Sequence, residues 1–142
     1  MTALDAFAVL AFLRDEPAAD EVEQLLRAPT VLAAVNAAEI VDQLVRVYGH
    51  DVDDVHADLA LLSRSGMGIA ATTSGTGIEA GRIRAAHYRR RGCPVTMADC
   101  VAAATALDLK LPLATSDAAL AAVVRHEGGA VHPLPNGRGV RP

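Results

Sequence analysis

Short apolar runs alternate with helical segments along the chain, and this alternation restricts the fold more than any other feature. Residues 31–35 are all apolar, as in a strand covered on both faces. Alternating strands and helices predict an α/β fold, a parallel sheet of four to five strands between two helical layers. We expect strands at residues 2–6, 30–35, 67–71, 111–115 and 130–134, and helices at 7–13, 17–26, 37–48, about 51–66, about 78–91, 94–107 and 117–126.

The length of the chain and its charge narrow the possible architectures and partners. With 142 residues, the chain is expected to form a single domain, residues 1–142, with about 136–142 as a flexible tail. The formal net charge is −4, and a mildly acidic protein repels a nucleic-acid backbone when its charge is evenly spread. A polyanionic partner would therefore need a local basic patch or a bound cation.

Cysteine usage and the absence of targeting signals indicate a cytoplasmic, soluble protein. Cys93 and Cys100 do not have the spacing of zinc ligands and are too few for a disulfide framework. The N-terminus lacks the features of a signal peptide. No apolar run reaches the roughly 18 residues of a membrane span, so we expect no membrane association.

Isolated acidic residues are the most informative side chains of the sequence. Asp99 is the only charge from Cys93 to Leu107, in an Ala-rich segment that is typical of an interior helix. Asp5, Glu39 and Asp117 are similarly alone within apolar stretches. A buried ionised carboxylate is costly unless it is paired or coordinated, so the recurrence of this pattern calls for a common explanation.

The predicted topology brings these acids to one edge of the sheet. Asp5 ends the first strand, Glu39 and Asp117 follow the second and fourth strands, and Asp99 begins the interior helix. Ligands of parallel sheets bind beyond the carboxyl ends of the strands. The alternative is that the acids are four separate helix caps and strand ends, since Thr96 and Asp99 have the spacing of a capping box. Asn36 is expected to cap the third helix.

Converging carboxylates repel one another and favour a bound cation. With oxygen ligands and no obligate His or Cys, the set suits Mg²⁺ or Mn²⁺ better than zinc. Such an ion activates water and stabilises an in-line displacement at phosphorus. The residues therefore predict metal-dependent hydrolysis of a phosphodiester bond.

Four motifs together resemble those of PIN-domain nucleases, and most of all the VapC-type toxins of toxin–antitoxin pairs. They are Leu4–Ala6, Val35–Ile40, Thr96–Ala106 and Leu113–Asp117. Their order and spacing carry the resemblance, which covers essentially the whole chain. It implies an endoribonuclease toxin that uses Mg²⁺ or Mn²⁺, forms a homodimer and is neutralised by a cognate antitoxin. The implied catalytic residues are the metal-binding acids Asp5, Glu39, Asp99 and Asp117, supported by the Thr115 hydroxyl.

Phe7 departs from the family pattern. PIN-domain nucleases usually have Ser or Thr two positions after the first acid, where this chain has Phe7. That hydroxyl often lies near the metal. The departure leaves open an alternative function, a non-catalytic PIN-like module that binds RNA or an antitoxin.

Two other segments have possible functional readings. Arg89, Arg90 and Arg91 are the only concentrated positive charge, and they are either a solvated helix end or a contact for an RNA backbone. Ser74–Gly81 resembles a dinucleotide-binding turn, but its glycine spacing differs by one from the usual fingerprint, so a plain strand-to-helix turn is the better interpretation. The five histidines lack metal-ligand spacing and are expected at the surface.

Overall fold

A computed structural model describes residues 1–142. Its centre is a five-stranded sheet in which every neighbouring pair is parallel, in the order β3-β2-β1-β4-β5. The predicted α/β class and parallel sheet are confirmed. The strands are β1 (Thr2–Leu4), β2 (Thr30–Ala33), β3 (Met67–Ala70), β4 (Leu113–Thr115) and β5 (Val131–Pro133).

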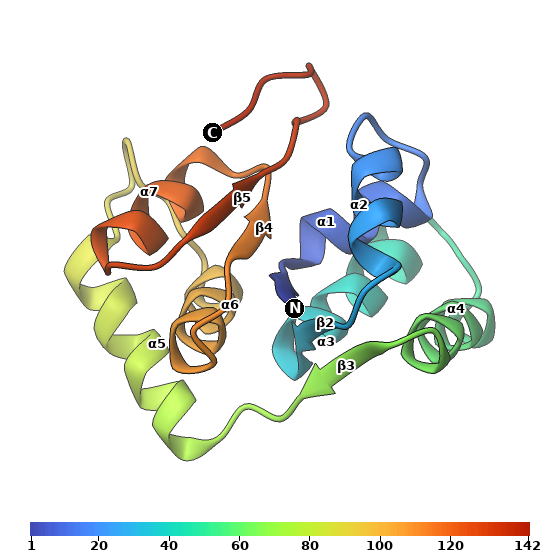
Figure 1. Ribbon diagram of the computed structural model, residues 1–142, viewed down its shortest axis with the longest axis horizontal. Coiled ribbons are helices and arrows are strands. Elements are labelled where there is room, and N and C mark those ends of the chain that lie inside the picture. The colour runs from blue at the N-terminus through green and yellow to red at the C-terminus, as the bar shows by residue number, and fades with distance from the viewer.

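Helices cover both faces of the sheet (Figure 1). α1 to α4 lie on one side, and α5 to α7 lie on the other. The π-helical turn η1 (Gln43–Val47) continues α3. The helices are α1 (Ala6–Leu13), α2 (Ala19–Leu26), α3 (Ala34–Asp42), α4 (Val52–Arg64), α5 (Ser74–His87), α6 (Met97–Asp108) and α7 (Ala118–His126).

Alternate residues of each strand feed two separate apolar cores. Leu4 and Leu32 pack with α1 to α4, whereas Ala3 and Val31 pack with α5 to α7. This follows from the period of two along a strand. α6 is buried from Asp99 to Ala106 in the second core, which explains why it consists of small residues. No helix has both the length and the apolar character needed to cross a membrane.

Two expected boundaries on the α5 side were wrong. α5 begins at Ser74 because the Thr73 hydroxyl accepts from the Thr76 amide over 3.1 Å and caps it. The glycines of Ser74–Gly81 therefore lie inside a helix, and no phosphate-binding turn exists there. α5 ends at His87, because Tyr88 leaves helical geometry, so the arginines that follow it are outside the helix.

In the C-terminal residues 136–142, which we expect to form a flexible tail, Arg141 contacts α2. Arg141 donates to Glu21 over 2.8 Å, and the amide of Asn136 donates to the carbonyl of Val140 over 2.8 Å. His132 on β5 also contacts Glu21, over 2.7 Å. Glu21 thus joins the last strand and the tail to α2.

Candidate active site

Asp5 follows β1 directly and is almost completely buried, with 1% of its surface exposed. Its Oδ1 accepts from the Ala8 amide over 2.7 Å and caps α1. Its Oδ2 is buried without a hydrogen-bond partner. A carboxylate oxygen is rarely left in this state, so Asp5 has one oxygen that is structural and one that is free for a ligand.

β4 and the turn that follows it supply the next two residues beside Asp5, because β1 and β4 are neighbours. Thr115 is the buried last residue of β4, and its hydroxyl accepts from the Asp117 amide over 3.0 Å. Asp117 caps α7 through Oδ1, which accepts from the Leu120 amide over 2.8 Å. The parallel register places Asp5 and Asp117 at the same edge of the sheet.

Asp99 lies in the first turn of α6 with 6% of its surface exposed. The Thr96 amide donates to Asp99 Oδ2 over 2.7 Å, and the Asp99 amide donates to the Thr96 hydroxyl over 3.0 Å. The capping box that the sequence offered as an alternative is therefore present. One carboxylate oxygen forms it, which leaves Oδ1 available to the site.

The fourth acid, Glu39, is half-buried in the second turn of α3 rather than at its start. The expected cap at Asn36 was wrong, because α3 begins at Ala34. Asn36 is instead buried inside the helix, where its Nδ2 donates to the Ala98 carbonyl over 3.3 Å. Asn36 Oδ1 and Glu39 Oε2 are both buried without partners.

Asn36 lies at this edge of the sheet, although the sequence predicted it only as a helix cap and not as a residue of the site. It lies one helical turn before Glu39 and contacts the start of α6 beside Asp99. Its polar character within the apolar segment 31–41 was a signal, but a helix cap explained it equally well.

The negative charges of the acids act on one another. The pKa of Asp5 is raised to about 7, mainly by burial and in smaller part by the charges of Asp99 and Asp117, against the opposing effects of the Thr115 hydroxyl and the Ala8 amide. Burial also raises the pKa of Glu39, and the charge of Asp99 raises it to a smaller extent. The structure thus brings the four acids to one region, where they repel one another.

The donor chemistry of this region fits a hard divalent cation. The unpartnered oxygens of Asp5, Asn36 and Glu39 are the kind of ligand that Mg²⁺ and Mn²⁺ take. As the side chains are placed, no group of three or more Asp, Glu, His or Cys residues is arranged to hold an ion. Three of the acids each use one oxygen for a helix cap, which turns the carboxylates toward the backbone.

A comparison with protein families identifies the chain. The family model described as PIN domain matches residues 2–125, which include all six sheet-edge residues discussed above. The chain belongs to the PIN-domain family. This agrees with the resemblance seen in the four acidic motifs. No curated protein matches the sequence.

Several solved structures share the fold of this PIN domain. It is similar to VapBC2 from Rickettsia felis bound to a promoter DNA fragment, with a TM-score of 0.68, 14% identity, and coverage of 94% of this chain and 98% of that chain. FitAcB from Neisseria gonorrhoeae has a TM-score of 0.65 and 21% identity, with coverage of 99% and 100%. A toxin–antitoxin complex from Klebsiella pneumoniae has a TM-score of 0.66 and 12% identity, with coverage of 86% and 91%.

Phe7 lies at the same edge of the PIN domain as Asp5. It is in the first turn of α1 and 47% exposed, whereas every other residue from Ala3 to Ala11 is buried. An apolar aromatic side chain therefore stands at the surface two positions after the first acid, where the family pattern has a hydroxyl.

The arginine cluster forms a small loop beyond α5. Arg89 and Cys93 form an antiparallel bridge, with N–O distances of 2.9 and 3.2 Å. Arg90, Arg91 and Gly92 turn between them, and Gly92 has a φ of +99°, a conformation that glycine adopts readily. The three arginines are all exposed, and the loop leads into α6, which carries Asp99.

Proposed function

We propose that this PIN domain is a metal-dependent endoribonuclease toxin that cleaves RNA and is neutralised by a cognate antitoxin. The observation that supports it most is Asp5, a carboxylate that is buried with an unpartnered oxygen and feels the charges of Asp99 and Asp117. The repulsion between these carboxylates is unfavourable for the folded state unless a bound cation compensates it.

The ion is proposed to be Mg²⁺ or Mn²⁺, held by Asp5, Glu39, Asp99 and Asp117. When bound, it would lower the pKa of a water molecule and stabilise charge on a phosphate oxygen. The Ala8, Thr96 and Leu120 amides fix one oxygen each of Asp5, Asp99 and Asp117. Thr115 positions the Asp117 segment through its hydroxyl. Each amide contact occupies one carboxylate oxygen and leaves the other for the ion, so binding would require the carboxylates to turn toward one another.

An antitoxin partner is supported by the structural neighbours, because those named above are toxin–antitoxin complexes or VapBC and FitAB-type assemblies. An antitoxin would stop cleavage by covering the acidic edge. We extend the proposal to a homodimer that acts in the cytoplasm, where RNA substrates are found.

Cleavage of single-stranded RNA by the purified protein tests the proposal. We expect cleavage with Mg²⁺ or Mn²⁺, none with EDTA, and none from Asp99→Asn in either condition. Cleavage that persists in EDTA, or in Asp99→Asn, would reject the metal-dependent role of the site.

A non-catalytic RNA- or antitoxin-binding module is the second candidate, and the exposed Phe7 favours it. This candidate predicts RNA or antitoxin binding with no cleavage under any metal condition. The same assay therefore separates the two functions.

A further inference from the structure

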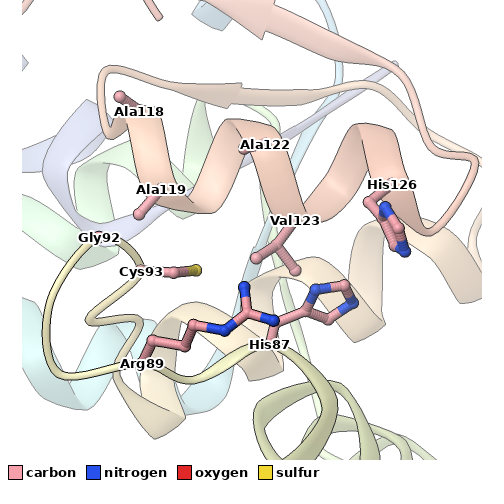
Figure 2. Close-up of a pocket in the computed structure, with 9 residues that line it drawn as sticks. All are labelled: His87, Arg89, Gly92, Cys93, Ala118, Ala119, Ala122, Val123 and His126. Atoms are coloured by element: carbon pink, nitrogen blue, oxygen red, sulfur yellow. The ribbon is translucent and has the colours of Figure 1, made fainter.

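A polar pocket lies between the loop after α5 and one face of α7, next to the acidic edge. Its volume is about 310 Å³. Figure 2 shows Arg89 and His87 facing the side of α7 that carries Ala119, Ala122 and Val123, with Cys93 on the loop. The small side chains of α7 leave this space open. The pocket therefore combines an apolar wall with the guanidinium of Arg89 and the imidazole of His87.

Both walls of the pocket continue into the acidic edge. Ala118 and Ala119 line the pocket and directly follow Asp117, which caps α7. On the other wall, Cys93 is separated from Thr96, the cap of α6, by only two residues, and Asp99 lies in the first turn of α6. A polymer bound at the acids would therefore extend into this pocket.

Arg89 is the free cation of the pocket. The antiparallel bridge between Arg89 and Cys93 fixes its backbone. No carboxylate lies within 4.0 Å of its guanidinium, whereas Arg82, on α5, pairs with Glu79 and Glu127. Arg84, also on α5, stacks on Tyr88 at 4.3 Å. Arg89 is therefore available to an incoming anion.

The histidines of the pocket add a second polar group. His87 Nε2 lies 2.6 Å from Glu127 Oε1, and its ring meets that of His126 edge-on, with centroids 4.9 Å apart. Arg82 also binds Glu127, over 2.5 Å, so the carboxylate that His87 contacts is also paired with an arginine. The prediction that all five histidines lie at the surface was wrong for His87, whose side chain is only 15% exposed where it contacts Glu127.

We propose that this pocket binds a backbone phosphate of the RNA next to the phosphate that is cleaved. This inference rests on the proposed function and extends it to the position of the substrate chain. A guanidinium is suited to phosphate because it donates through two parallel N–H groups. The alanines of α7 offer an apolar surface to the attached sugar. Arg89 thus offsets the net acidic charge of the protein and sets the direction in which the strand leaves the acids.

Arg89→Ala and Arg90→Ala form a matched pair for testing the pocket. Both remove one positive charge from the same exposed loop, but only Arg89 lines the pocket. Binding of a short mixed-sequence single-stranded RNA is measured in EDTA by fluorescence anisotropy at several salt concentrations. We expect Arg89→Ala to weaken binding about tenfold, the size of a lost charge-assisted contact. Its salt slope should fall by about 0.7, the value for one phosphate contact on a single strand. Equal effects of the two substitutions would overturn the pocket, because they would indicate only general attraction.

Cys93 provides a readout that does not depend on activity. It lines the pocket and is half-buried, whereas Cys100 is fully buried. We expect RNA to slow the alkylation of Cys93 by N-ethylmaleimide in the wild type and to do so far less in Arg89→Ala. Protection by poly-glutamate equal to that by RNA would overturn the proposal in favour of an acidic peptide. Absence of RNA cleavage by the wild type would count against the nuclease, whereas absence of protection would count against the pocket, so the two failures are distinguishable.

Discussion

Thr96 and Asp99 bind each other at the start of α6, the Thr96 amide to Asp99 Oδ2 over 2.7 Å and the Asp99 amide to the Thr96 hydroxyl over 3.0 Å. The same carboxylate raises the pKa of both Asp5 and Glu39 through its charge. Asp99 is therefore a helix cap and a member of the acidic edge at once. The two interpretations of this motif are compatible, because one carboxylate oxygen caps the helix and the other remains available to the site.

The first prediction separates the role of Asp99 as a helix cap from the role of its negative charge in the site. Asp99→Asn keeps an oxygen that can accept from Thr96, so we expect the free energy of unfolding to change little while metal-dependent cleavage is lost. Thr96→Ala removes the cap hydroxyl and keeps the carboxylate, so it should cost about 1 kcal/mol of stability and retain most cleavage. Chemical denaturation and the RNA assay measure the two effects. The opposite pattern would show that Asp99 serves only as a cap.

The raised pKa of Asp5 gives a prediction about pH. The unfolded chain loses this proton near pH 3.8 and the folded chain near pH 7, so between these values the folded state binds more protons. Stability therefore falls as pH rises through this window, and the penalty is complete above pH 7. The shift corresponds to about 4 kcal/mol at most.

Asp5→Asn removes this penalty, and asparagine also caps helices well. Without metal, we expect the variant to be more stable than the wild type at pH 8, and the advantage to shrink toward pH 4. Thermal unfolding in EDTA across this range measures it. A stability difference that does not change with pH would contradict the burial of an ionisable Asp5.

The predicted α/β topology and the edge position of the acids followed from pattern alone. Lone acids after buried strands have few other positions in a parallel sheet. The error in the start of α5 arose because a local hydrogen bond competed with the helix propensity of the sequence. Thr73 caps α5, which begins four residues before the expected start, and this cap outweighs the low helix propensity of Gly75 and Gly77.

Other features could not be read from the sequence because they depend on contacts between distant segments. Asn36 binds the carbonyl of Ala98, 62 residues away. His87 and Glu127 are 40 residues apart and meet only because α5 and α7 pack on the same side of the sheet. No period or spacing in the sequence encodes either pair.

Thr115 gives a third prediction, with serine as the matched control. Thr115→Val keeps the shape of the buried side chain but removes the hydroxyl that accepts from the Asp117 amide. That hydroxyl also lowers the pKa of Asp5, so we expect the pH profile of cleavage to move to higher pH and the rate at neutral pH to fall. Thr115→Ser should restore both. Equal profiles for Val and Ser would contradict the role of the hydroxyl.

Phe7 gives a fourth prediction. Because Phe7 is 47% exposed, its replacement should change stability by less than about 1 kcal/mol. We expect Phe7→Ser, which restores the hydroxyl of the family pattern, to raise the rate of RNA cleavage several-fold over Phe7→Ala. Identical rates for the two variants would show that the hydroxyl is not needed in this protein.

Binding of Mn²⁺, followed by the loss of the electron paramagnetic resonance signal of the free ion, tests the shared acidic site most directly. Asp5→Asn, Glu39→Gln, Asp99→Asn and Asp117→Asn should each weaken binding at least about tenfold. Asp42→Asn is the control, because Asp42 follows Glu39 on α3 but pairs with Arg46 at the surface. We expect that variant to bind Mn²⁺ like the wild type. Unchanged affinity in the four site variants, or an equal loss in Asp42→Asn, would contradict a metal site shared by acids from four separate segments.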